Sequence, residues 1–194
     1  MKVSKQQAEL NREAILNCAA KVFRERGFDG VGVSDLAKAA GLTHGGLYAH
    51  FENKEALALE ATQRARAQQK VVLDTYASGR NRLKAIMEMY LSPSHRDNPG
   101  AGCPMAANAT EVVRQSSELQ QAFVEGIDDL IALVEAEIHD SSDAQTHALA
   151  VLTAATMLGG LTMARIYAKT APVKSNDVLR ILQSELLHLH AERH

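Results

Sequence analysis

The amino-acid sequence predicts an all-α protein of about nine helices, and three observations lead to this prediction. Apolar residues recur at helical spacing over most of the chain, as at Leu119, Phe123, Ile127 and Leu130. No segment of any length shows the alternation of apolar and polar residues that a half-buried strand requires. Hydrophobic residues form 46% of the 194 residues, enough for a sizeable core, and aromatics at 4% leave that core mainly aliphatic.

Two helices are expected at the N-terminus. Residues from about 6 to 26 carry one apolar stripe, and Gly27 suits the position that follows a helix. We expect Phe28 to fold back onto the core. Residues 33–40 form a second, shorter helix, which Gly41 ends.

A third short helix is expected to begin after Thr43, a good N-cap residue, and to run to about Phe51. Two short helices joined by a tight turn, here over about 33–52, are typical of a helix-turn-helix DNA reader. Gly45 and Gly46 remove side chains where the backbone would approach the major groove. We therefore assign residues 1–54 to a three-helix DNA-binding domain.

The remaining residues, 55–194, are expected to form a helical sensing and dimerisation domain. Asn53 is the expected N-cap of its first helix. The expected helices cover about 54–76, 81–91, a stretch from 104, 119–138, 144–169 and 176–191. Two prolines and two glycines between residues 92 and 102 favour a loop there.

Charge and composition exclude several classes of protein. Residues 1–70 hold 11 Lys and Arg against 8 Asp and Glu, whereas residues 71–194 hold 10 against 15, which would direct DNA to the N-terminal part. An N-terminus without an apolar stretch and only two cysteines indicate a cytoplasmic protein. The uncharged stretch 144–164 holds several Thr and Gly, so we expect a buried interface helix and no membrane span.

The segment from Gly41 to Leu57, GLTHGGLYAHFENKEAL, resembles the TetR/AcrR family of transcriptional regulators. The resemblance is close over about residues 10–60. It implies a homodimer whose protomers join through about 144–169 and 176–191. It also implies a repressor that leaves a palindromic double-stranded DNA operator when its C-terminal domain detects a signal. The expected DNA-binding residues are Ser34, Thr43, His44, Gly45, Gly46, Tyr48, His50 and Lys54.

The chain departs from the family pattern at three positions. Gly32 stands where a capping Thr is usual, Gly46 where Ser, Thr or Ala is frequent, and Ala49 where a larger polar residue is common. Fewer long side chains would enter the groove, so the operator sequence stays open.

Cys103 is the most specific candidate for the signal. It follows Gly102 at a loop-to-helix junction, and a helix N-terminus favours a reactive thiolate. This Gly-Cys segment also resembles that of the electrophile-sensing members of the family, although a small packed residue would look the same.

A reversible small-molecule inducer in the helical body is the other candidate. The side chains that would line its site are Met87, Tyr90, Met105, Phe123 and Arg165, any of which could instead be packing. No cofactor is expected, and no metal, because His188 and His190 at i, i+2 lie on different helix faces.

Other classes of function have less support. The sequence lacks a Gly-rich phosphate loop, a nucleophile elbow and a cluster of metal ligands, so we expect no enzyme. The alternative is a helical protein of the same fold with an enzymatic or protein-interaction role and no DNA binding.

Overall fold

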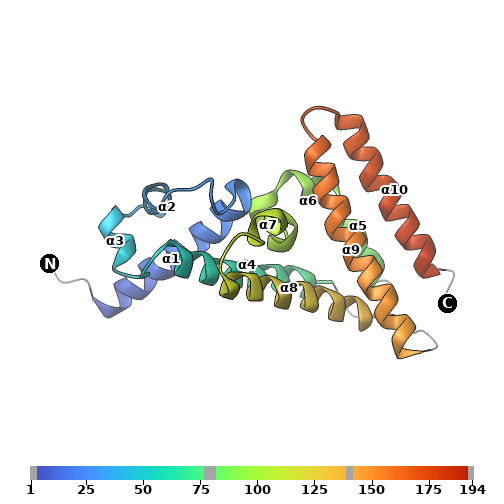
Figure 1. Cartoon of the computed structure of the whole chain (residues 1–194), viewed down its shortest axis with the longest axis horizontal. Coiled ribbons are helices and arrows are strands. Elements are labelled where there is room, and N and C mark those ends of the chain that lie inside the picture. The colour runs from blue at the N-terminus through green and yellow to red at the C-terminus, as the bar shows by residue number, and fades with distance from the viewer. Residues whose placement is uncertain (1–3, 77–81, 139–141, 192–194) are drawn as a thin grey trace. The chain divides into compact units, whose positions relative to one another are not determined.

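A computed structural model describes residues 4–76, 82–138 and 142–191, and within these ranges the chain is helical (Figure 1). The described part holds ten α-helices and one 3-10 helix, so the predicted all-α class is confirmed. The elements are α1 Lys5–Arg26, α2 Val33–Ala39, α3 His44–Tyr48, α4 Lys54–Asp74, α5 Arg82–Tyr90, α6 Pro93–Asp97, η1 Pro99–Ala101, α7 Pro104–Val112, α8 Ser117–Glu135, α9 Asp143–Tyr167 and α10 Pro172–Ala191.

Local capping explains where the N-terminal helices begin. The Thr43 hydroxyl accepts a hydrogen bond from the Gly46 N–H (3.1 Å), and the Asn53 side chain accepts one from the Ala56 N–H (2.8 Å), as predicted. Gly32 occupies the N-cap of α2 without any side-chain cap, so this short helix begins with fewer partners for its first N–H groups.

The structure differs from the sequence prediction at two prolines, and the prediction was wrong at the first of them. The segment 92–102 was expected to be a loop, but it contains α6 and η1, because Ser92 caps α6 and Pro93 occupies its first turn. Pro172 lies between the two predicted helices 144–169 and 176–191, and α10 begins at this residue, a little earlier than expected. A proline in the first turn lacks only an N–H that would be unpaired anyway, so it starts these helices rather than ending them.

The chain packs as two compact units. One contains residues 1–69 and 99–123, and the other contains residues 70–98 and 124–194. The helices α4 and α8 each contribute to both. The functional division at residue 54 remains a prediction, because packing does not test it.

In the first unit, α1, α2, α3 and α7 surround a core that includes three phenylalanines. Phe28 folds back onto this core as predicted, with its ring 5.3 Å from that of Phe23 and 6.1 Å from that of Phe123. Leu47 of α3 and Phe51 are also buried, so the short third helix is anchored by apolar contacts.

In the second unit, α9 packs along α10. A Cβ at Gly160 would lie 2.4 Å from Leu182 and 3.2 Å from Leu91, so the two helices approach closely because this position has no side chain. The buried Ser175 hydroxyl donates to the Ala164 carbonyl (2.7 Å), which satisfies a polar group inside the helix pair.

One described helix, α9, has the length and apolar composition of a membrane span. Its most apolar window is 44% buried within the chain, and a single helix of this kind is weak evidence for a membrane span. The fold therefore adds no support for a membrane-spanning role of α9.

Candidate nucleic-acid interface and sensor site

The reader motif is α2, the turn at Gly41 and α3. Gly41 has a φ of +72°, the left-handed region that the tight turn requires. Leu47 points into the core from α3, which leaves the opposite side of this helix in solvent. The sequence therefore builds a short helix with one anchored face and one free face, as a major-groove helix needs.

The predicted contact residues lie on α3, at its N-cap, on α2 and at the chain that follows α3. Ser34, Thr43 and His44 are exposed, and Tyr48 is 44% exposed. The rings of His44 and Tyr48, one helical turn apart, meet edge to face at 5.1 Å. This pairing presents an imidazole and a phenol hydroxyl side by side.

His50, which lies between α3 and α4, and Lys54 are both half-buried. Lys54 is the first residue of α4, whose N-cap is Asn53. The long side chain of a lysine can keep its ammonium group in solvent while its stem is covered. Both positions remain compatible with phosphate contacts.

The two glycines of α3 differ in their surroundings. A Cβ at Gly45 would meet nothing within 4 Å, so this glycine opens the free face of the helix. A Cβ at Gly46 would lie 3.2 Å from the Thr43 hydroxyl, which is the cap of the same helix. Gly45 therefore leaves the surface of α3 open, whereas Gly46 makes room for the cap.

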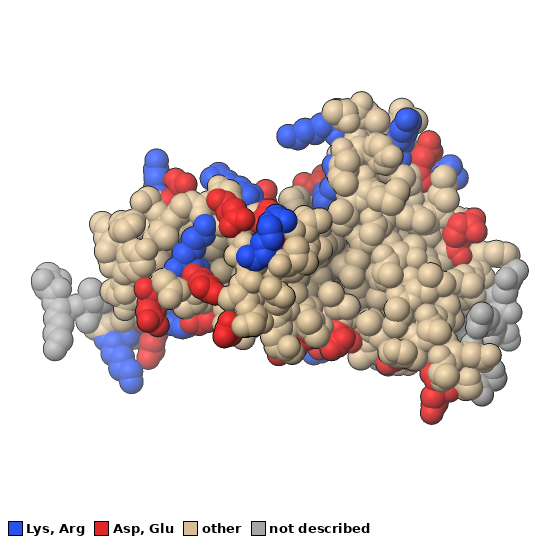
Figure 2. All heavy atoms as spheres, in the orientation of Figure 1, with Lys and Arg blue, Asp and Glu red and all other residues tan. Residues whose placement is uncertain are grey.

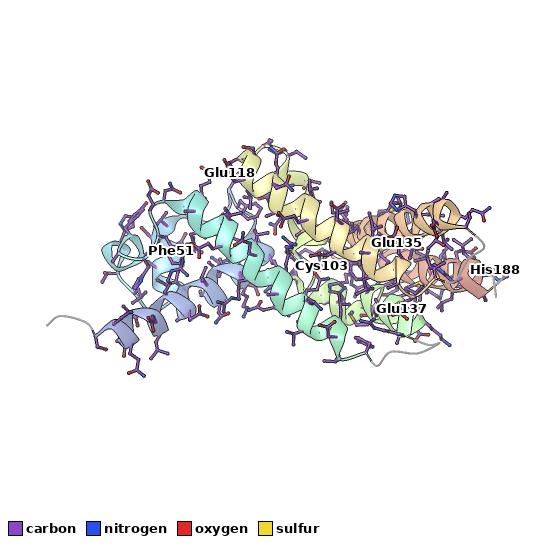
Figure 3. All side chains as sticks on the ribbon, turned by 90° about the horizontal axis from the view of Figure 1, so that it is seen from below. Phe51, Cys103, Glu118, Glu135, Glu137 and His188 are labelled. Atoms are coloured by element: carbon purple, nitrogen blue, oxygen red, sulfur yellow. The ribbon has the colours of Figure 1, made fainter. Side chains whose placement is uncertain are left out.

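Cys103, labelled in Figure 3, is the N-cap residue of α7 and is only 2% exposed. Its side chain makes no capping hydrogen bond, and within the described residues it forms no disulfide. The other cysteine, Cys18, is half-buried, and burial raises the pKa of its thiol.

A buried arginine beside Cys103 was missed by the sequence analysis. Arg24 of α1 is 6% exposed and donates to the Gly102 carbonyl (2.9 Å) and to the Gln68 side chain (2.9 Å). Burial lowers the pKa of this guanidinium, while the sulfur of Cys103 and the Glu25 carboxylate act in the opposite direction. An arginine near the end of a helix looks like an ordinary solvated residue, so the sequence carries no signal for this role.

The predicted lining residues of a ligand site are placed in both units. Met105 and Phe123 are buried in the first unit, where Phe123 packs against Phe28. Met87, Tyr90 and Arg165 belong to the second unit. There Tyr90 packs against the ring of His95, which lies 4.7 Å away.

Arg165 has a structural role in its own unit. Its guanidinium donates to the His95 carbonyl (3.1 Å) and to the Arg96 carbonyl (3.2 Å), which lie in α6. The pKa of the His95 imidazole falls to about 4, first because it is buried and also because Arg165 is nearby. These contacts hold α6 against α9.

The outer face of α9 is apolar. The side chains that share it recur at 4-3-4-4-3 spacing and are Ala148, Leu152, Ala155, Gly159, Met163 and Ile166, all of them exposed. Leu152 is 52% and Ile166 70% exposed, and charged residues are sparse on this side of the second unit in Figure 2. A run of this kind is typical of a helix that packs on another helix.

Two family models match the chain. One, described as bacterial regulatory proteins of the tetR family, matches residues 15–61, and the other, described as a tetracyclin repressor-like C-terminal domain, matches residues 79–176. The first covers the helix-turn-helix region, and the second covers half of the chain.

Curated relatives agree with these models. The chain is 26% identical over 137 residues to the HTH-type transcriptional repressor NemR of Escherichia coli strain K12, covering 68% of this chain and 69% of that protein. It is 39% identical over 54 residues to the HTH-type transcriptional regulator AcrR of Shigella flexneri, a quarter of that protein's length.

Solved structures of regulators share the fold. A TetR transcriptional regulator from Chloroflexus aurantiacus is 26% identical with a TM-score of 0.78, covering 93% of this chain and 94% of that one. The reduced form of Escherichia coli NemR is 24% identical with a TM-score of 0.74, covering 91% and 94%. A structure of AibR with isovaleryl coenzyme A and operator DNA is 20% identical with a TM-score of 0.63, covering 91% and 97%.

Proposed function

We propose that this chain, which belongs to the TetR family of bacterial regulatory proteins, is a homodimeric repressor that leaves a palindromic operator when a signal reaches its helical body. The chain is a DNA-binding transcription regulator and not an enzyme. We further propose which residues contact DNA, how the protomers pair, that the protein is cytoplasmic and what chemistry the signal has.

DNA reading is assigned to the free face of α3 and the residues that flank it. Thr43, Tyr48, His50 and Lys54 would contact phosphates and fix the position of the reader, while His44 would reach base edges. The exposure of Thr43, His44 and Tyr48 around a helix anchored by Leu47 supports this assignment.

Dimerisation is assigned to α9 and α10. The exposed apolar run on α9 is continuous from Ala148 to Ile166, and burying it would remove apolar surface from water. The open position of Gly159, where a Cβ would meet nothing within 4 Å, supports a close crossing of two helices. A two-fold dimer would place two readers on successive major grooves, about 34–36 Å apart.

The signal is assigned to Cys103. The observation that carries this choice is its position at the first turn of α7, buried and next to the carbonyl that Arg24 of α1 binds. An electrophile such as iodoacetamide would react there in a balanced step. The thiol proton passes to water, the sulfur forms a bond to the CH₂ carbon, and iodide leaves with the electron pair of the broken bond.

Release would follow because the new group needs space at a packed position. A shift of α4 that changes the spacing of the two readers is the simplest route from body to DNA. The alternative signal is a small molecule that binds the body reversibly.

The test is a fluorescence anisotropy titration on DNA from just upstream of the gene, with the unmodified and the carbamidomethylated protein. Both are made in a Cys18→Ser background, so that only Cys103 reacts, and Cys103→Ser serves as the control. We expect the parent to bind and to release after alkylation, and Cys103→Ser to bind and stay bound. If neither protein releases the DNA, Cys103 is not the sensor and the reversible ligand takes its place.

A further inference from the structure

Two side chains join the C-terminal end of α1 to the segment that begins at Gly102. Arg24 Nη1 donates to the Gly102 carbonyl, and Asn108 Nδ2 of α7 donates to the Phe23 carbonyl, each at 2.9 Å. Arg24 and Asn108 are 6% and 2% exposed. Because both groups are buried, losing either partner would leave a polar atom unsatisfied inside the protein.

A third contact follows directly after the helix. The backbone N–H of Phe28 donates to Glu111 Oε2 of α7 at 2.6 Å. Gly27, with a φ of +79°, leaves the space that the Glu111 carboxylate fills, since a Cβ there would collide with it. We call the three side chains that make these contacts the α1 clamp: Arg24, Asn108 and Glu111.

The clamp adds partners at the end of α1. The Phe23 carbonyl already accepts from the Gly27 N–H (2.9 Å), and Asn108 is its second donor. The N–H of Phe28 lies beyond the helix end, and Glu111 accepts from it. Asn108 and Glu111 both belong to α7, so α7 fixes the direction in which the chain leaves α1. The next elements along the chain are α2 and α3, which form the reader.

The same segment contains the proposed sensor. Cys103 lies between Gly102, whose carbonyl Arg24 binds, and the helix that carries Asn108 and Glu111. The sulfur is in an interior without room for an added group, because protein cores are close-packed. An adduct on Cys103 must therefore displace the first turn of α7, and with it the atoms that hold α1.

We propose that Arg24, Asn108 and Glu111 are positioning residues that carry the state of Cys103 to the reader through the end of α1. This inference rests on the proposed function, in which Cys103 is the sensor. It adds a route that starts on α1 and does not require a shift of α4. An intact clamp would hold α2 and α3 in the position that binds DNA, and a broken clamp would release them from it.

The test compares two substitutions of Glu111 that differ in one property. Glu111→Gln keeps an oxygen that accepts from Phe28, whereas Glu111→Met has similar length and no acceptor. Arg64→Gln is a control, since Arg64 of α4 binds Glu13 of α1 on the surface (2.6 Å) and is not part of the clamp. Each variant, in the Cys18→Ser background, is titrated on the upstream DNA before and after carbamidomethylation, and its folding is checked by thermal melting.

We expect alkylation to weaken DNA binding by the parent at least tenfold. Glu111→Met should bind at least fivefold more weakly than the parent before alkylation and lose most of the response, while Glu111→Gln and Arg64→Gln keep both. A Glu111→Met variant that binds and responds like the parent overturns the clamp alone. A parent that binds without responding overturns the proposed sensor, and the transmission with it.

A second measurement uses the parent protein, in case Glu111→Met does not fold. Hydrogen exchange of the Phe28 amide is followed before and after carbamidomethylation of Cys103. Faster exchange at this amide, with unchanged exchange in the middle of α1, is expected because Glu111 would no longer accept from it. Unchanged exchange at Phe28 would overturn the clamp.

Discussion

Two glycines with positive φ show how much a single position can decide. Gly27 and Gly41 both adopt the left-handed region that other residues disfavour. A Cβ at Gly41 would meet nothing within 4 Å, whereas one at Gly27 would collide with the carboxylate of Glu111. Backbone strain acts at both positions, and the loss of a hydrogen bond acts only at Gly27.

Alanine substitution at these glycines separates the two effects. Gly41→Ala should lower the free energy of unfolding by about 1 kcal/mol, from left-handed strain alone. Gly27→Ala should lower it by about 2–4 kcal/mol, because the Glu111 contact with Phe28 is lost as well. Urea unfolding followed by circular dichroism gives both values, and equal losses would contradict this account.

His95 gives the protein a dependence on pH. Its pKa is about 4 in the folded chain and 6.5 in the unfolded one, so the unfolded chain binds more protons between these values. Stability from this group is therefore complete above about pH 6.5 and falls as the pH drops toward 4, by at most about 3 kcal/mol.

The prediction is checked by calorimetric melting from pH 7 to pH 4. The parent should lose more stability over this interval than His95→Asn, which cannot gain a proton there and can still donate to the Tyr90 carbonyl that the imidazole contacts at 2.9 Å. Parallel curves for the two proteins would show that His95 is not the group responsible.

Among the elements, α3 shows a conflict between stability and function. A glycine inside a helix costs about 0.5–1 kcal/mol relative to alanine, yet α3 keeps two glycines within five residues. At Gly45 nothing in the chain prevents a larger side chain. In the proposed function, the close approach of DNA accounts for a glycine at this position.

Gly45→Ala should therefore change stability and DNA affinity in opposite directions. We expect the free energy of unfolding to rise by about 0.5–1 kcal/mol and operator affinity to fall about fivefold or more, because a methyl group would separate α3 from the groove. Gly46→Ala is the companion variant, in which crowding of the Thr43 cap lowers stability instead. If Gly45→Ala binds DNA as well as the parent, this face does not approach the groove.

Most helices could be predicted from local signals, and the failures also have local causes. The N-caps at Thr43 and Asn53 follow from side chains that accept hydrogen bonds from nearby N–H groups. The end of α1 follows from Gly27, which adopts a φ of +79° that other residues disfavour. The helix α6 was missed because Pro93 also suits a loop, and only its position after the Ser92 cap makes it helical.

The site is only partly readable from the sequence. The free face of α3 follows from the spacing of Leu47 and Tyr48 along a helix. The burial of Arg24 does not, because its partners Gly102 and Gln68 lie 78 and 44 residues away and are brought to it by the tertiary fold.

At the scale of the whole molecule, the proposed repressor needs two copies that join through α9. The exposed run on this helix is apolar, and a Cβ at Gly159, within this run, would meet nothing within 4 Å. A charge placed in the middle of this run should therefore separate the protomers.

Leu152→Glu should shift the protein from dimer to monomer in light scattering at about 10 μM, since a carboxylate buried without a partner is costly. Leu10→Glu is the matched control, because Leu10 of α1 is similarly exposed (58%) and lies outside α9. Operator affinity should fall with dimerisation in the first variant only. A Leu152→Glu protein that remains dimeric would place the interface elsewhere.

Selection of bound DNA from a random library by the purified protein, followed by sequencing, tests the symmetric dimer and its two readers together. A two-fold dimer with one reader on each protomer predicts enriched sequences that are inverted repeats, with half-sites spaced by about one helical turn. Enrichment of single or directly repeated half-sites would contradict the symmetric dimer, and no enrichment at all would contradict sequence-specific reading by α3.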